Sequence, residues 1–217
     1  MSGLLKTVPS SAAGVVGIHL KSLAEDAGCK VNDNEIKPGK EVLALMEKMS
    51  DNEKGQLLNL LNGGAGIQPD AAVVFFDANR TFLTLSLYDV VKFKDFVKKD
   101  KMDDFSDEGS GVQVCNNIAI KGNQAWICLS STKRIDPDAI AAYASLSESQ
   151  SFLNTDMSKI ILEEDADIVG WSKFNNILSN LMSRSERTKA AMAAGLLFED
   201  VDAVSFEIDF EKGELEF

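Results

Sequence analysis

The stretch AAGVVGIHLKSLAEDAG, residues Ala12–Gly28, predicts a short strand that runs directly into a helix. Its first part is rich in β-branched and other apolar residues, which favour a strand. The second part, KSLAEDAG, contains good helix formers and stops at Gly28, a residue type that commonly ends helices. We therefore expect a strand over Val15–Leu20, followed by a helix.

A similar pattern occurs again near the end of the chain. The segment ADIVGWSKFNNIL places Val169-Gly170 where the first stretch has Val16-Gly17. Ser183 and Glu186 form a capping-box pattern that predicts a helix through Ala194. The segment DVDAVSFEIDFEKGELEF then predicts a hairpin in the place that QPDAAVVFFDANRTFLTLSL occupies in the first half. We interpret this order of strand, helix and hairpin as a weak internal repeat.

Between the two copies, turn and capping signals predict further elements. Apolar spacing from Lys40 and the Ser50/Glu53 capping box indicate two helices. Further along, a hairpin is expected at Ala71–Tyr88 and a helix from Val90. A second hairpin is expected at Val112–Ser130, with its turn near Gly122-Asn123, and another helix from Asp136-Pro137 to about Leu146.

These elements predict an α+β fold with a mainly antiparallel sheet covered by helices. The order of the first copy also allows a ferredoxin-like split βαβ arrangement. We assign residues 1–147 to the first copy and 148–217 to a second, shortened copy, packed together as one unit. Because the second copy stops after its last strand, we expect either a natural short copy or a piece of a longer polypeptide, and we favour the piece.

Composition narrows the classes of function. The chain has 217 residues, of which 45% are hydrophobic and 26% charged, and a net charge of -12. This charge repels nucleic acid at long range, so we expect no nucleic-acid partner. No apolar run approaches the roughly 20 residues of a membrane span, and the first residues do not resemble a signal peptide.

His19 is the only histidine and the first candidate for catalysis. A histidine base needs a nucleophile and an orienting carboxylate, and no serine or cysteine lies in a recognisable nucleophile motif. The matching residue of the second copy is Ser172, so the repeat gives the imidazole no special role. We interpret His19 as structural and predict no catalytic residues.

The loop after Lys101 imitates the start of a calcium-binding loop. Asp104, Ser106, Glu108 and Gly109 have suitable spacing, but the final bidentate ligand would fall at Cys115. A flexible acidic loop is the favoured interpretation. The glycines of Gly64-Ala65-Gly66 and Gly39-Lys40 also fail to complete a phosphate loop. We predict neither a metal nor a cofactor.

The three cysteines, Cys29, Cys115 and Cys128, are too few and too scattered for a zinc site or a closed disulfide framework. Pairing Ile120 with Ala125 in the second hairpin predicts two faces. One face has Val112, Val114, Ile118, Ile127 and Leu129, and the other has Cys115, Asn117, Trp126 and Cys128. We expect free thiols that are buried or half-buried.

Two charged regions allow a binding role. Five lysines lie along the helix that is expected from Val90: Lys92, Lys94, Lys98, Lys99 and Lys101. A solvated helix face is the favoured interpretation, and a docking patch for an acidic partner is the alternative. In the predicted C-terminal hairpin, Glu211 would oppose Glu214 and Asp209 would oppose Glu216. We interpret these like charges as protection against edge-to-edge pairing, in preference to cation binding.

The segments VPSSAAGVVGIHLKSLAEDAG, QPDAAVVFF and LSLYDVVKFKDFVKK together resemble an uncharacterised family of gut-bacterial lipoproteins, catalogued as a domain of unknown function. The resemblance implies an exported protein on the bacterial cell envelope. It also implies that a leader and a lipid-attachment cysteine lie upstream of this sequence. The family has no assigned catalytic residues, so none are transferred to this chain.

We therefore expect a non-catalytic envelope protein that binds another protein or a glycan. The alternative is an enzyme such as a hydrolase, with a site completed by chain outside this sequence. A structural module of a larger assembly is a third hypothesis. The sequence does not identify the ligand or the oligomeric state.

Overall fold

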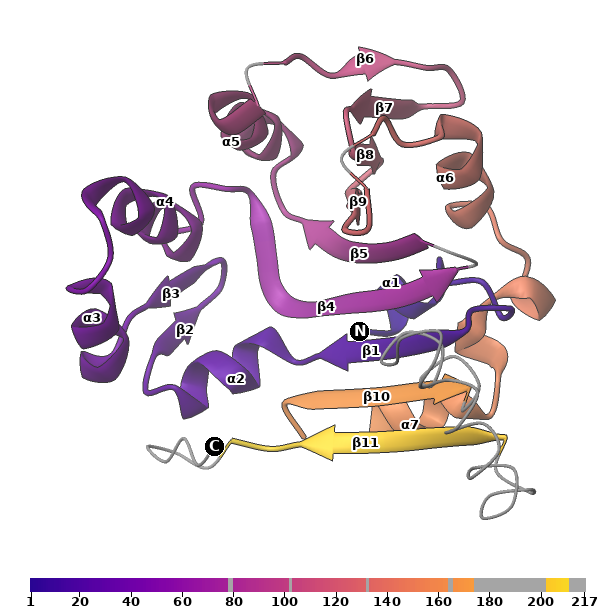
Figure 1. The fold of residues 1–217 in the computed structure, drawn as a ribbon, viewed down its shortest axis with the longest axis horizontal. Helices are drawn as coiled ribbons and strands as arrows, with labels where there is room; N and C mark the ends of the chain where they lie inside the picture. The colour runs from indigo at the N-terminus through magenta and orange to yellow at the C-terminus, as the bar shows by residue number, and fades with distance from the viewer. Residues whose placement is uncertain (78–79, 102, 132, 164–165, 174–201, 211–217) are drawn as a thin grey trace, which may run out of the picture.

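The computed structural model describes residues 1–77, 80–101, 103–131, 133–163, 166–173 and 202–210. In these residues, nine strands form one antiparallel sheet in the order β11-β10-β1-β4-β5-β9-β8-β7-β6 (Figure 1). Their bounds are β1 Gly14–Ile18, β4 Ile67–Asp77, β5 Arg80–Leu87, β6 Ser106–Asp107, β7 Val112–Cys115, β8 Ile118–Lys121, β9 Gln124–Cys128, β10 Ile168–Lys173 and β11 Ala203–Ile208. A small separate sheet pairs β2, Lys30–Asn32, with β3, Glu35–Lys37.

The helices connect these strands. The long connection from β1 to β4 contains α2, α3 and α4, which lie beyond one end of the central strands in Figure 1. The bounds are α1 Ser2–Leu5, α2 Leu20–Asp26, α3 Lys40–Met46, α4 Asp51–Leu61, α5 Val90–Lys101, α6 Pro137–Tyr143 and α7 Met157–Glu163. Two short 3₁₀ helices, η1 Glu148–Gln150 and η2 Phe152–Asn154, precede α7.

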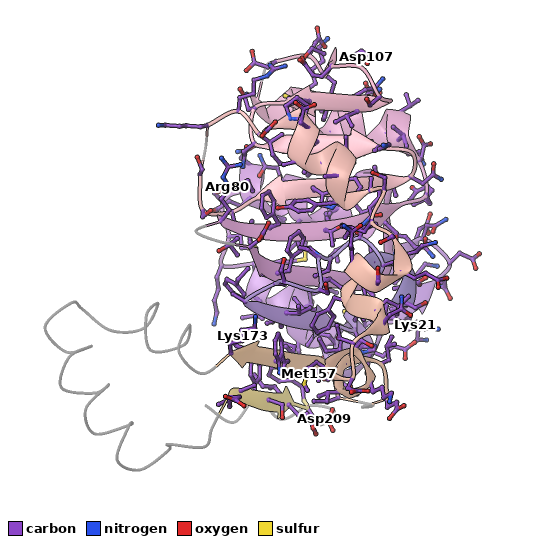
Figure 2. All side chains as sticks on the ribbon, turned by 90° about the vertical axis from the view of Figure 1, so that its right-hand side faces the viewer. Lys21, Arg80, Asp107, Met157, Lys173 and Asp209 are labelled. Atoms are coloured by element: carbon purple, nitrogen blue, oxygen red, sulfur yellow. The ribbon has the colours of Figure 1, made fainter. Side chains whose placement is uncertain are left out.

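Each face of the sheet has its own hydrophobic core. The larger core packs α1, α6, η2 and α7 against one face, with Trp126, Phe75 and Phe82 among its fully buried side chains. The smaller core packs Phe93 and Val97 of α5 against the other face, over β5, β8 and β9. Two cores arise because neighbouring residues of a strand point to opposite faces. Figure 2 shows the sheet from the side, with Asp107 and Asp209 at its two ends.

The structure confirms the α+β class and several of the expected elements. The predicted change from strand to helix occurs, although β1 ends at Ile18, two residues before the expected end, and α2 begins at Leu20. α4 begins with the predicted capping box, in which the Glu53 N–H donates to the Ser50 hydroxyl over 3.4 Å. The N-cap of α6 is Asp136, and Pro137 is its first helical residue. The short elements α1, β2, β3 and α7 are additions that the patterns did not indicate.

The strand order differs from the ferredoxin-like arrangement that the sequence allowed. In a split βαβ unit, a third strand separates the two strands that the helix connects. Here β1 pairs directly with β4, and the two strands are antiparallel. The three helices between them return the chain to the neighbouring position in the sheet.

The expected hairpin at 112–130 consists of two hairpins. Asn116 adopts a positive φ of 51°, and a two-residue turn at Asn116-Asn117 joins β7 to β8. Ile120 opposes Ala125 as predicted. The extra turn, however, places Cys115 in the smaller core while Cys128 lies in the larger core. The prediction that these two thiols share a face was therefore wrong.

Strands from the two segments interpreted as copies of a repeat lie side by side in one sheet. β1 pairs with β10, and the outer strands β4 and β11 flank them. In this register Val16 opposes Gly170, and Gly17 opposes Val169. Gly17 thus faces the larger core while Gly170 faces the opposite side, so residues that match in sequence point to different faces.

Two predicted parts of the second copy lie outside the described residues. These are the helix with the Ser183/Glu186 capping box and the C-terminal hairpin strand after Phe210. The described strand of that hairpin, β11, pairs with β10 along the edge of the sheet.

Candidate functional site

A hollow between α4 and α5 is the main candidate for a binding site. Its lining comes from one face of α4 and from two residues of α5. The lining residues are Asp51, Asn52, Gly55, Gln56, Asn59, Phe96 and Lys99. Both helices are fixed locally, because the capping box holds the start of α4 and Phe93 anchors α5 in the smaller core.

The hollow presents groups that can form hydrogen bonds. Asn52, Gln56 and Asn59 follow each other at helical spacing, so their amides share one face of α4. Among the described residues, none of the hydrogen bonds uses these three side-chain amides. Each amide offers both donors and an acceptor. Sequence analysis missed this site, although the helical spacing of the amides was a signal that could have found it.

Gly55 leaves room at the centre of this face. A Cβ atom placed on Gly55 meets no atom within 4 Å. The half-buried ring of Phe96 supplies the apolar part of the lining, and Lys99 supplies a positive charge. The hollow therefore combines an apolar ring, neutral amides and charges of both signs.

Most of the predicted lysine face of α5 interacts with neighbouring residues. The ammonium group of Lys98 lies 2.6 Å from the Asp104 carboxylate, and this hydrogen bond raises the pKa of Lys98. Lys92 donates to the Tyr88 hydroxyl over 3.1 Å, which raises the pKa of Lys92. Lys94 lies 6.0 Å from the ring centroid of Phe105. Lys99 instead lines the hollow, and the side chain of Lys101 lies outside the described part.

His19 is the N-terminal cap residue of α2, directly after β1. Its backbone N–H donates to the carbonyl oxygen of Asp167 over 2.7 Å. The Nε2 atom is buried and has no hydrogen-bond partner. Among the hydrogen bonds of the described residues, none joins the imidazole to a serine hydroxyl or a cysteine thiol. The structure does not bring His19 into a nucleophile and base pair.

The acidic loop is held by basic residues. Arg134 forms an ion pair with Glu108 and also donates to the Ser106 hydroxyl over 2.8 Å. Asp104 pairs with Lys98, as described above. Ser106 and Asp107 form the short strand β6. These carboxylates therefore serve in local contacts around the edge of the sheet.

All three cysteines are buried, as the sequence predicts, and Cys29 and Cys128 are free thiols. Among the described residues, one group of carboxylates is close enough to hold a metal ion. It consists of Asp26, Asp167 and Asp209. No helix in the described parts of the chain has the length and apolar character needed to cross a membrane.

Comparisons with known proteins identified no relative of this chain. No family model, curated protein or solved structure matches the chain. The resemblance to gut-bacterial lipoproteins stays a prediction, and function must be argued from the site itself.

Proposed function

We propose that the protein is a non-catalytic binding protein of the bacterial cell envelope that holds a glycan in the hollow between α4 and α5. The observation that carries the proposal is the row of three amides on α4 that have no hydrogen-bond partner within the described parts of the chain, in a hollow shared with Phe96 and Lys99. The envelope location rests on the resemblance described above.

Glycan chemistry fits the groups in the hollow. Sugar hydroxyls both donate and accept hydrogen bonds, as do the amides of Asn52, Gln56 and Asn59. A sugar ring also has an apolar C–H face, which can pack against an aromatic ring such as Phe96. Small-molecule sites typically combine an apolar surface with a few well-placed polar groups. A neutral or weakly charged glycan also avoids the repulsion that the net charge of -12 exerts on anions.

Two substitutions at Gly55 test the proposal. A methionine at this position extends into the hollow, whereas an alanine leaves most of the space free. Both residues favour a helix more than glycine does, so both variants should fold. The matched pair therefore separates blocking of the hollow from loss of stability.

The assay is saturation-transfer NMR followed by calorimetric titration, with N-acetylchitotriose, cellotriose and maltotriose as probes. We expect wild type and Gly55→Ala to bind at least one probe. Gly55→Met should weaken that binding at least tenfold, or about 1.4 kcal/mol. An Asn123→Ala variant, which removes an exposed amide from the turn between β8 and β9, should bind as wild type does. The proposal fails if no probe binds or if Gly55→Met binds unchanged.

A protein partner is the second candidate, and exposed apolar side chains favour it. Leu43, Leu45, Met49 and Leu60 lie on α3, on α4 and on the turn between them, and each is at least 38% exposed. Exposed apolar groups of this kind are typical of protein contacts. If the partner is a second copy, wild type should sediment as a dimer and Leu45→Ser as a monomer. A monomeric wild type would exclude self-association.

A further inference from the structure

Three carboxylates meet at one end of the strands β10 and β11. Asp167 precedes β10 and Asp209 follows β11, and because Ile168 opposes Ile208 these two residues lie at the same end of the strand pair. Asp26 is the last residue of α2, which leaves the sheet from the neighbouring strand β1 (Figure 1). One oxygen atom from each carboxylate lies within 4.8 Å of the others. In Figure 2, Asp209 marks this edge of the sheet.

Asp167 is the unusual member of the group. Its side chain is fully buried, at 0% exposed. Oδ2 accepts the backbone N–H of Phe210 over 3.0 Å, but Oδ1 is buried and has no hydrogen-bond partner among the described residues. Burying a carboxylate oxygen without a partner is costly, and two neighbouring carboxylates add repulsion. A cation held between the three carboxylates would give Oδ1 a partner and offset this repulsion.

None of the ion pairs among the described residues involves these three carboxylates. The pairs join Lys98 to Asp104, Arg134 to Glu108 and Lys159 to Asp156. His19 is close in the backbone, but its ring nitrogens do not belong to the group that could share an ion. The side-chain donors are therefore all oxygen atoms, which is the set preferred by hard divalent cations.

We propose that Asp26, Asp167 and Asp209 form a calcium-binding site that joins α2 to the edge strands β10 and β11. Calcium–oxygen bonds of about 2.3–2.6 Å allow two ligand atoms on opposite sides of the ion to lie about 5 Å apart. Oxygen atoms that all lie within 4.8 Å of one another can therefore share one calcium ion. Calcium also accepts several carboxylates in flexible geometry, whereas magnesium demands near-octahedral coordination and usually keeps several waters. Backbone carbonyl groups and water would complete the coordination of the ion.

The site would strengthen the edge of the sheet. β11 has β10 as its partner on one side, and its residues from Ser205 to Asp209 are exposed. A bound ion adds a connection between this edge strand and α2, which comes from a distant part of the sequence. Because the ion binds the folded state only, it should raise the melting temperature as its concentration increases.

The experiment uses the full chain, freed of metal with a chelator and dialysed. Calcium chloride is titrated at constant ionic strength, with magnesium chloride in a parallel series. Binding is measured by calorimetry and stability by the melting temperature. We expect calcium to bind with a dissociation constant on the order of 1 mM or tighter and to raise the melting temperature. Magnesium should have a clearly smaller effect.

Three variants locate the ion. Asp209→Asn changes an exposed residue, so it should fold normally and weaken calcium binding roughly tenfold or more. Asp167→Asn keeps the shape of the buried side chain, and it should abolish the calcium response without lowering the melting temperature of the metal-free protein. The matched control is Asp202→Asn, an exposed carboxylate next to the opposite end of β11. It should bind calcium as wild type does.

Several outcomes would overturn the proposal. One is the absence of calcium binding to wild type at about 10 mM, which is beyond the range of protein calcium sites. Equal effects of calcium and magnesium would show nonspecific screening. An equal loss in Asp202→Asn and Asp209→Asn would place the ion elsewhere. None of these results depends on the glycan proposal, because the hollow between α4 and α5 contains none of the three carboxylates.

Discussion

Replacing Gly17 with alanine should destabilise the protein through one identifiable contact. A Cβ atom on Gly17 would lie 2.5 Å from Cγ2 of Ile161 in α7, and 3.0 Å from Cε of Met1. Carbon atoms prefer separations of about 3.5–4.0 Å, so the first contact is about 1 Å too short. The end of Met1 can move aside, but Ile161 is fully buried and β1 has hydrogen-bonded strands on both sides.

Overpacking of this kind typically costs about 1–3 kcal/mol. For a chain of this size, each kcal/mol lowers the melting temperature by about 2–4 °C. We therefore expect Gly17→Ala to melt about 2–12 °C lower than wild type, and to unfold at a lower urea concentration with an unchanged slope. Urea titration followed by circular dichroism measures both quantities.

Two second-site substitutions identify the atom responsible. Leucine has no Cγ2 methyl on its β carbon, so Ile161→Leu should relieve the contact and recover about 1 kcal/mol in the double variant. Valine keeps Cγ2 and loses only the outer methyl, so Ile161→Val should give additive losses. Equal coupling for the two double variants would refute this reasoning, as would a Gly17→Ala protein as stable as wild type.

Three other predictions follow from single contacts. The Tyr143 hydroxyl donates to Asp77. Burial is the larger cause and this hydrogen bond the second cause that raise the pKa of Tyr143 above its usual value of 10.0. The contribution of Tyr143 to the free energy of unfolding is therefore complete below pH 10.0 and is lost as pH rises towards the folded-state pKa. In urea titrations at increasing pH, the Tyr143→Phe variant should lose less stability at alkaline pH than wild type does. Hydrogen bonds from Ser50 lower the pKa of Glu53, so the capping box should stabilise α4 above pH 4.5 and fail as pH falls through the folded-state pKa. Helical circular dichroism of wild type and Glu53→Gln should therefore differ at pH 7 and converge in acid. The three buried thiols should react with a thiol reagent only after urea unfolds the protein.

Local signals predicted much of the first copy. The change from β-branched residues to helix formers located β1 and α2, and capping residues located the starts of α4 and α6. These signals work because they depend on residues within one turn of a helix or one strand. The Asn116-Asn117 turn was missed because an apolar hairpin could continue through it, and this single turn moved Cys115 to the other face of the sheet.

Neither candidate site was predictable as a whole, because each combines distant parts of the chain. The hollow needs α4 beside α5, and the carboxylate group needs Asp26 beside the end of β10 and β11. The sequence pattern predicts Asp209 opposite Glu216 in a C-terminal hairpin, and Glu216 lies outside the described residues. In the structure, β11 pairs with β10, which brings Asp209 close to Asp167.

The register of the central strands explains why residues that match between the two proposed copies do not have the same surroundings. Val16-Gly17 and Val169-Gly170 match in sequence, but they pair with each other one residue out of step. Because side chains alternate between faces, this offset turns Gly17 towards α7 and Gly170 towards Phe206. Each glycine thus admits a different neighbour. His19 follows β1 and is the N-terminal cap residue of α2. Ser172 lies within β10 and donates to the carbonyl oxygen of Ala13, so the two matched residues have different surroundings.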